Sequence, residues 1–223
     1  GKTTVGRMSI RLLEPTAGRV WFDGIDLTTL NENEMIKIRP RMQIIFQDPY
    51  GSLNPRFTVE RIIGEAMLIH KKANPDNIKE KIAELMERVG LSPGYMKRYP
   101  HEFSGGQRQR IGIARALALN PEYIVCDEPV SALDVSIQAQ IINLLKELQE
   151  KFNLSLLLIS HDLNVVKYLS HHIAVMYLGR LVEFAPASVL GREPAHPYTK
   201  ALMAANPVSY PKKREKRLVL VGD

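Results

Sequence analysis

The apolar residues of the chain alternate between strand-length runs and helix-length stripes. Tyr123–Cys126 and Leu154–Ile159 are runs of strand length, as in central strands of a parallel sheet that are buried on both faces. Between them, apolar residues recur at helical spacing, at Ile137, Ile141, Leu144, Leu145 and Leu148. Strand, helix and strand in this order predict a βαβ unit, so the expected fold class is α/β with a mostly parallel sheet.

The remaining patterns predict further elements around this unit. Helices are expected at Thr3–Leu13, Val59–His70, Pro75–Val89 (with Asn74 as N-cap), Gln107–Leu119 and within His196–Ala205. Strands are expected at Arg19–Phe22 and Met42–Phe46, and a hairpin at Ile173–Leu178 and Leu181–Phe184 that turns at Gly179 and Arg180. Residues 57–100 lack strand signals, which predicts a small helical lobe inserted into the α/β core.

Charge and composition narrow the function classes. The net charge is +6, but +4 of it falls in residues 212–217, whereas a nucleic-acid binder normally has a basic face on its folded body. Nucleic acid is therefore not an expected partner, and the basic tail is interpreted as a solvated arm or, alternatively, a membrane-facing one. No apolar run approaches the roughly 18 residues of a membrane helix. A single cysteine, Cys126, excludes an internal disulfide and favours a core role in a cytoplasmic protein.

The first four residues match the end of a phosphate-binding loop. Gly1-Lys2-Thr3-Thr4 fits the final part of G-x-x-x-x-G-K-[ST], in which the lysine neutralises phosphate charge and the hydroxyl binds Mg²⁺. Four residues are a weak signal, and a chance match is the alternative. Because the sequence begins inside this motif, we expect it to be a fragment.

Two acidic residues end the first buried strand. Asp127 and Glu128 follow four apolar residues, and ligands of open α/β sheets bind at the carboxyl ends of strands. Asp127 is suited to hold Mg²⁺ and Glu128 to orient or deprotonate an attacking water. A strand that simply ends in a solvated turn before Pro129 is the alternative.

A glycine pair and a histidine add to this pattern. Ser104-Gly105-Gly106-Gln107 opens a predicted helix, and its free amides and helix dipole can attract an anion; a flexible turn is the alternative. His161 directly follows the second buried strand, where it can contact a terminal phosphate, although a lone histidine there is more often structural.

The sequence resembles ATP-binding-cassette (ABC) ATPases over essentially its full length. Six segments occur in the family's order: Gly1–Thr4, Gln47, Ser104–Gln107, Asp127 with Glu128, Ser131–Asp134 and His161. The resemblance implies a P-loop NTPase core with a mostly parallel sheet, a partial antiparallel β subdomain and an inserted α-helical subdomain at residues 57–100. It also implies that these lie within an ABC ATPase domain of residues 1–207 whose N-terminus is expected to be missing.

The resemblance also implies ATP and Mg²⁺ as ligands and a head-to-tail dimer of cassettes. Because most of the phosphate loop's amide groups are absent from this sequence, we expect it to bind ATP poorly. Nucleotide contacts are then expected from Gly1, Lys2, Thr3, Thr4, Ser104, Gly105, Gly106, Gln107 and Asp134. Metal contacts are expected from Thr3, Gln47 and Asp127, and roles in hydrolysis from Glu128, His161 and Gln47. In the dimer, the Ser104–Gly106 segment faces the phosphate held by Lys2 of the other cassette.

Two segments resemble the oligopeptide/dipeptide/nickel importer subfamily: residues 46–56, as the coupling loop, and residues 196–202 within a C-terminal extension of residues 186–223. A simple turn before a helix is the alternative for His196–Tyr198. The subfamily implies a peripheral protein on the cytoplasmic face of the cell membrane, with two permease subunits and, indirectly, an external solute-binding protein. It leaves open whether the solute is a peptide, nickel or a short sugar, whether the two cassettes are identical, and whether an iron–sulfur cluster is present.

Two other functions stay open at this stage. A soluble ABC protein of DNA repair or translation is one, although the spacing of 57 positions from Gln47 to Ser104 fits a compact lobe rather than a long coiled coil. A catalytically inactive regulatory cassette is the other, and the presence of Glu128 and His161 argues against it.

Overall fold

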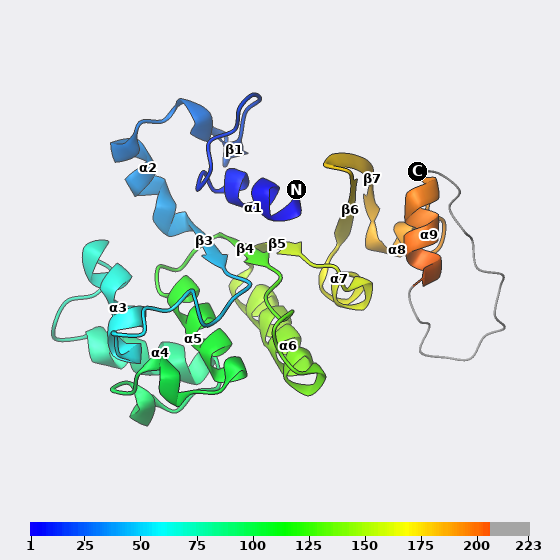
Figure 1. Cartoon of the computed structure of the whole chain (residues 1–223). Helices are drawn as coiled ribbons and strands as arrows, with labels where there is room; N and C mark the ends of the chain where they lie inside the picture. Colours follow the sequence, from blue (N-terminus) through cyan, green and yellow to red (C-terminus); the bar gives the residue numbers. More distant parts are fainter. Residues whose placement is uncertain (206–223) are drawn as a thin grey trace. The chain divides into compact units, whose positions relative to one another are not determined.

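The computed structural model describes residues 1–205 of the chain (Figure 1). Its contacts divide it into two units, residues 3–159 and residues 1–2 with 160 onward, each of which is described by itself. The basic segment at 212–217 lies outside the described residues. No helix within residues 1–205 combines the length and the apolar character needed to cross a membrane.

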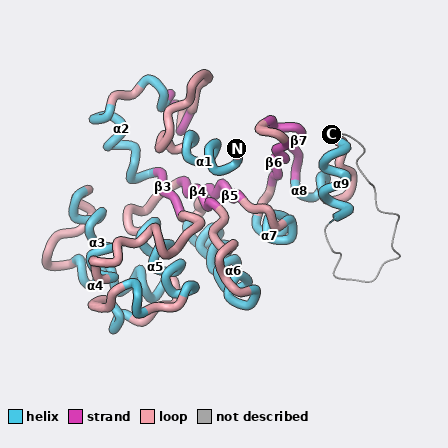
Figure 2. Tube along the Cα trace, viewed as in Figure 1, coloured by secondary structure: helices cyan, strands magenta, loops and turns pink. Residues whose placement is uncertain are grey.

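The larger unit is built on a parallel sheet. Strands β3 (Met42–Ile45), β4 (Tyr123–Asp127) and β5 (Ser155–Ile159) lie in the order β3-β4-β5. Helix α6 (Val135–Phe152) connects β4 to β5, which confirms the predicted βαβ unit. The register pairs Ile45 with Cys126 and Asp127 with Ile159, so the three strands end close together. Figure 2 shows the three strands side by side.

The first part of this unit differs from the expected pattern. Helix α1 (Lys2–Ser9) ends four residues before the expected Leu13, because Arg11 takes a positive φ of 52° that a helix does not allow. The strand expected at Arg19–Phe22 covers only Trp21–Phe22 (β1), and a turn at Asp23 and Gly24 joins it to the antiparallel strand β2 (Ile25–Asp26). Helix α2 (Glu32–Ile38), between the 3₁₀ turns η1 (Leu27–Thr29) and η2 (Arg39–Arg41), was not expected.

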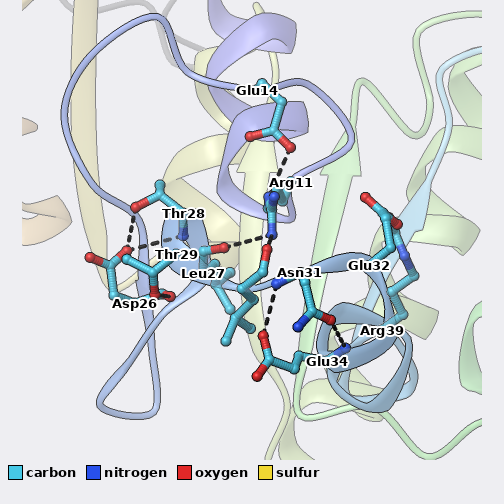
Figure 3. Close-up of polar contacts among 11 residues, drawn as sticks. Arg11, Glu14, Asp26, Leu27, Thr28, Thr29, Asn31, Glu32, Glu34 and Arg39 are labelled. Atoms are coloured by element: carbon cyan, nitrogen blue, oxygen red, sulfur yellow. Dashed lines mark hydrogen bonds and ion pairs between the residues drawn. The ribbon is translucent and has the colours of Figure 1, made fainter.

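Polar contacts fix this first part (Figure 3). The Arg11 guanidinium donates to the carbonyls of Leu27 at 2.8 Å and Leu30 at 2.6 Å, which ties the end of α1 to the segment before α2. Asn31 and Glu34 form a reciprocal capping box that begins α2. The core beneath consists of buried apolar side chains: Ile10, Leu27, Met35, Met42, Val125 and Ile159.

Residues 57–100, all of them described, contain helices and turns only. Helix α3 (Val59–Ile69) begins at the N-cap Thr58, and α4 (Ile78–Arg88) follows it, with the 3₁₀ turns η3 (Pro93–Tyr95) and η4 (Pro100–Glu102) after it. The start expected for α4 at Pro75 is wrong: residues 75–77 form a turn, in which the Asn74 side chain accepts from the backbone N–H of Asp76 and Asn77, and the helix begins at Ile78. Helix α5 (Gly105–Leu117) packs against α3, α4 and α6.

The smaller unit contains α7 (Leu163–Leu169), an antiparallel hairpin of β6 (His172–Tyr177) and β7 (Arg180–Pro186), α8 (Ala187–Leu190) and α9 (Pro197–Ala205). The hairpin is confirmed, but its turn lies at Leu178 and Gly179, with φ of 45° and 79°, one residue earlier than expected. Two consecutive positive φ values suit the twist of a two-residue hairpin loop. Ile173, Val175 and Leu190 form the buried core of this unit.

Candidate functional site

The parallel sheet brings Gln47 and the acid pair together. Gln47 follows β3 by two residues, and Glu128 follows β4 directly. Because β3 and β4 are parallel neighbours, their carboxyl ends share one edge of the sheet. There the Gln47 side-chain amide donates to the Glu128 carboxylate, Nε2 to Oε2 at 3.1 Å.

Thr3 and Asp127 meet at the same edge. The Thr3 hydroxyl, in the first turn of α1, donates to the Asp127 carboxylate at 2.9 Å between Oγ1 and Oδ1. Asp127 is only 2% exposed. Helix α1 reaches this position because Gly6 has no side chain: a Cβ there would lie 2.6 Å from Cδ1 of Ile159 in β5. The glycine therefore lets the helix lie against the sheet.

Glu128 has an unusual backbone conformation. Its φ is +46°, in the left-handed region that costs a residue with a side chain about 1–3 kcal/mol. Hydrogen bonds hold both of its main-chain groups: its N–H donates to the Ile159 carbonyl at 2.9 Å, and its carbonyl accepts from the Ser131 N–H at 3.2 Å and hydroxyl at 3.1 Å. The surrounding structure thus fixes the turn that carries the glutamate.

Lys2 and His161 belong to the smaller unit. The Lys2 ammonium, which begins α1 after Gly1, donates to the Ser160 carbonyl at 3.4 Å. His161 lies between Ser160 and Asp162, whose carboxylate caps α7 by accepting from the N–H groups of Asn164 and Val165. Thr4 follows Thr3 in the first turn of α1 and is exposed.

The Ser104–Gln107 segment is a helix start. Ser104 is the N-cap of α5, and its side chain and that of Gln107 form a capping box. The helix begins at Gly105, two residues before the expected Gln107, so both glycines lie in its first turn. Gly106 is buried, and a Cβ there would lie 2.5 Å from Cγ2 of Ile137 in α6. The glycine is therefore required for close packing of α5 on α6, a reason that the sequence did not reveal.

Comparison with known proteins identifies the family. A family profile described as "ABC transporter" matches residues 1–131, more than half of the chain. The chain belongs to the ABC transporter family. A second profile, "Oligopeptide/dipeptide transporter, C-terminal region", matches residues 182–221.

Curated ABC proteins match the whole chain. It is 55% identical to the putative oligopeptide transport ATP-binding protein YkfD of Bacillus subtilis, over 100% of this chain and 69% of YkfD. It is 54% identical to the oligopeptide transport ATP-binding protein AppF of the same organism, again over 100% of this chain and 69% of AppF. A putative peptide import ATP-binding protein of Brucella abortus is 53% identical, over 100% of this chain and 70% of that protein.

A solved ABC cassette has the same fold. The cassette MJ0796, in a dimeric post-hydrolysis state bound to ADP and Pi, aligns with a TM-score of 0.75 and 29% identity over 84% of this chain and 81% of its own. These findings confirm the predicted P-loop NTPase fold and ABC family. This ABC chain is accordingly an ATP-binding, ATP-hydrolysing cassette. Its division into residues 1–207 and 186–223 stays a prediction.

The ABC cassette also contains a link that sequence reasoning missed. The Arg115 guanidinium, on α5, donates to the Ser52 carbonyl at 2.6 Å, and burial lowers the pKa of Arg115. The Arg108 guanidinium lies 3.9 Å from the centre of the Tyr50 ring and donates to the Pro100 carbonyl at 2.6 Å. The loop of residues 46–56 and α5 are thus joined directly. Only the helical spacing of these arginines, seven residues apart, could have indicated a shared helix face.

Proposed function

We propose that this chain is the ATP-hydrolysing subunit of an ABC importer that takes up peptides. The meeting of Thr3, Asp127, Glu128 and Gln47 at one sheet edge is the observation that carries the hydrolytic part. The C-terminal match at residues 182–221 and the names of the relatives support peptides as the solute class. Nickel or a short sugar is the alternative solute within the subfamily that the sequence resembles.

The residues at the sheet edge fit Mg²⁺. The Thr3 hydroxyl and the Asp127 carboxylate converge to 2.9 Å, and both are the hard oxygen ligands that Mg²⁺ prefers. Within residues 1–205 no group of three or more His, Cys, Asp and Glu side chains could form an all-protein metal cage. Mg²⁺ usually retains several water ligands and is bound by one or two carboxylates together with substrate phosphates, so it does not need such a cage. Gln47 is a further oxygen ligand in this proposal. Bound Mg²⁺ supplies charge neutralisation of the β- and γ-phosphates.

Each remaining side chain has a separate proposed role. Lys2 neutralises phosphate charge next to the N–H groups of Gly1, Thr3 and Thr4. Glu128 accepts the proton of the attacking water, and Gln47, which already contacts its carboxylate, orients that water. His161 donates a hydrogen bond to the terminal phosphate.

The remaining predicted residues act on a partner. In a head-to-tail dimer, Ser104, Gly105, Gly106 and Gln107 contact the nucleotide of the second cassette through the start of α5, and Asp134 couples the two sites. The second cassette is either identical or a related chain. Residues 46–56 and the lobe of residues 57–100 receive two permease subunits on the cytoplasmic face of the membrane. An external solute-binding protein acts through those permeases.

The test uses the assembled transporter in proteoliposomes. Glu128→Gln is expected to retain ATP binding and to lower turnover by about 10²–10⁴-fold, the usual contribution of a general base. Glu122→Gln is the matched control, because Glu122 lies just before the same strand and pairs with Arg41 instead. Turnover of the Glu128 variant at the level of the control would refute the role. Stimulation by Ni²⁺ with its binding protein, and not by peptides, would refute the solute class.

A further inference from the structure

The Gln138 side chain ties the loop between β4 and α6 to the helix. Gln138 lies in the first turns of α6, and its Nε2 donates to two main-chain carbonyls, Val130 at 2.9 Å and Leu133 at 3.0 Å. The Leu133 N–H donates back to the Val130 carbonyl at 3.1 Å. Because carbonyl oxygens only accept, the NH₂ end of the amide must face them, which fixes its orientation.

The same loop reaches Glu128. Ser131, next to Val130, uses both its N–H and its hydroxyl to hold the Glu128 carbonyl, at 3.2 Å and 3.1 Å. From the other side, the Ile159 carbonyl accepts from the Glu128 N–H at 2.9 Å. Hydrogen bonds therefore connect Gln138, through the loop, to the backbone of Glu128. The φ of +46° at Glu128 is unfavourable unless the surrounding structure holds it.

The loop also ends at Asp134. Asp134 occupies the N-cap position of α6, yet its side chain makes no capping hydrogen bond to the helix. An aspartate at this position normally caps. Gln138, which lies inside α6, instead ties the loop to the helix. The exposed Asp134 carboxylate takes no part in capping.

We propose that Gln138 is a positioning residue for ATP hydrolysis. It holds the 130–133 loop and thereby sets the backbone of Glu128, and with it the direction of the Glu128 carboxylate. It does not touch the nucleotide. This inference rests on the proposed function, in which Glu128 is the general base.

The experiment compares variants in the assembled transporter. Gln138→Met removes both N–H donors at similar length, and Gln138→Glu keeps the shape but places a carboxylate against two carbonyls. Gln140→Met is the matched control on the same helix, two residues further, where the side chain is exposed and contacts Arg110. ATP turnover, KM and the Kd for a fluorescent ATP analogue are measured for each variant, with thermal unfolding in parallel.

A positioning role predicts a split between the kinetic constants. Both Gln138 variants should lose about 10–100-fold in kcat, the effect of displacing a catalytic group by about 1 Å, while KM and Kd stay within about twofold. In a Glu128→Gln background the same changes should leave the residual rate within about twofold, because the group they position is already gone. The control should match the wild type.

The outcomes separate this inference from the proposed function. Wild-type kcat in both Gln138 variants, together with a large loss in Glu128→Gln, would overturn the role of Gln138 alone. Wild-type turnover in Glu128→Gln would overturn the proposed base itself. A fall in nucleotide affinity or melting temperature that parallels the fall in turnover would show a merely structural role and would also overturn the inference.

Discussion

The contact between Gly106 and Ile137 allows a quantitative test of why a glycine is needed at the start of α5. Gly106→Ala would place a methyl group 2.5 Å from Cγ2 of Ile137, whereas apolar carbons normally approach to about 3.5–4.0 Å. Helix α5 and helix α6 would therefore have to separate by about 1 Å at this point, and the change is expected to destabilise the fold.

The size of the effect follows from overpacking. Forcing an extra methyl into a packed interface costs about 1–3 kcal/mol. Alanine is more favourable than glycine within a helix by about 0.5–1 kcal/mol, which offsets part of the overpacking cost. A net loss of about 1–2 kcal/mol in a chain of this length lowers the melting temperature by about 2–8 °C.

A second substitution makes the test specific. Ile137→Ala removes the Cγ2 that the new methyl would meet, so the Gly106→Ala/Ile137→Ala double variant should be more stable than the sum of the single effects predicts. Thermal and urea unfolding of the four proteins give the coupling energy, expected to be about 1 kcal/mol or more. Additive single effects, or an unchanged melting temperature in Gly106→Ala, would refute the steric explanation.

Two further predictions concern titratable groups. Burial raises the pKa of the Cys126 thiol to about 12, so iodoacetamide at neutral pH should leave the folded chain unmodified and label it fully in urea; stoichiometric labelling of the folded chain would contradict this. The Thr199 hydroxyl and the N–H groups of Ala195 and His196 hold the pKa of Glu183 below its usual value. The ionised form therefore stabilises the fold above about pH 4.3, the ordinary pKa of glutamate, and Glu183→Gln should be less stable at neutral pH. That difference should shrink as the pH falls further below this value, and a difference independent of pH would refute it.

Elements with strong periodicity could be predicted from the sequence, and those fixed by local hydrogen bonds could not. The apolar runs of β4 and β5 and the apolar stripe of α6 were sufficient to predict these elements, because their burial requires apolar residues at those positions. Helix α2 is short and half polar, and its signal was the capping pair Asn31 and Glu34 rather than a stripe. The start of α4 was misplaced because Asn74 favours a turn and a helix cap equally well.

The candidate site follows the same division. Glu128 could be predicted from the residues, because it directly follows a buried strand and ligands bind at the carboxyl ends of such strands, whereas Gln47 was indicated only by the family resemblance. The positive φ of Glu128 was not predictable, since it results from hydrogen bonds to Ile159 and Ser131 that form only in the folded sheet. Gln138 was missed for a related reason: its two acceptors are main-chain carbonyls, which leave no trace in side-chain chemistry.

Two arginines of α5 connect this helix directly to the loop of residues 46–56. Ser104 lies 57 positions after Gln47 in the sequence, yet Arg115 and Arg108 connect Ser52 and Tyr50 directly to α5. A displacement of α5 would therefore reach residues 46–56 directly, through the Arg115 hydrogen bond and the Arg108–Tyr50 contact. In the proposed importer, the helices of the lobe at residues 57–100 would not be needed to transmit it.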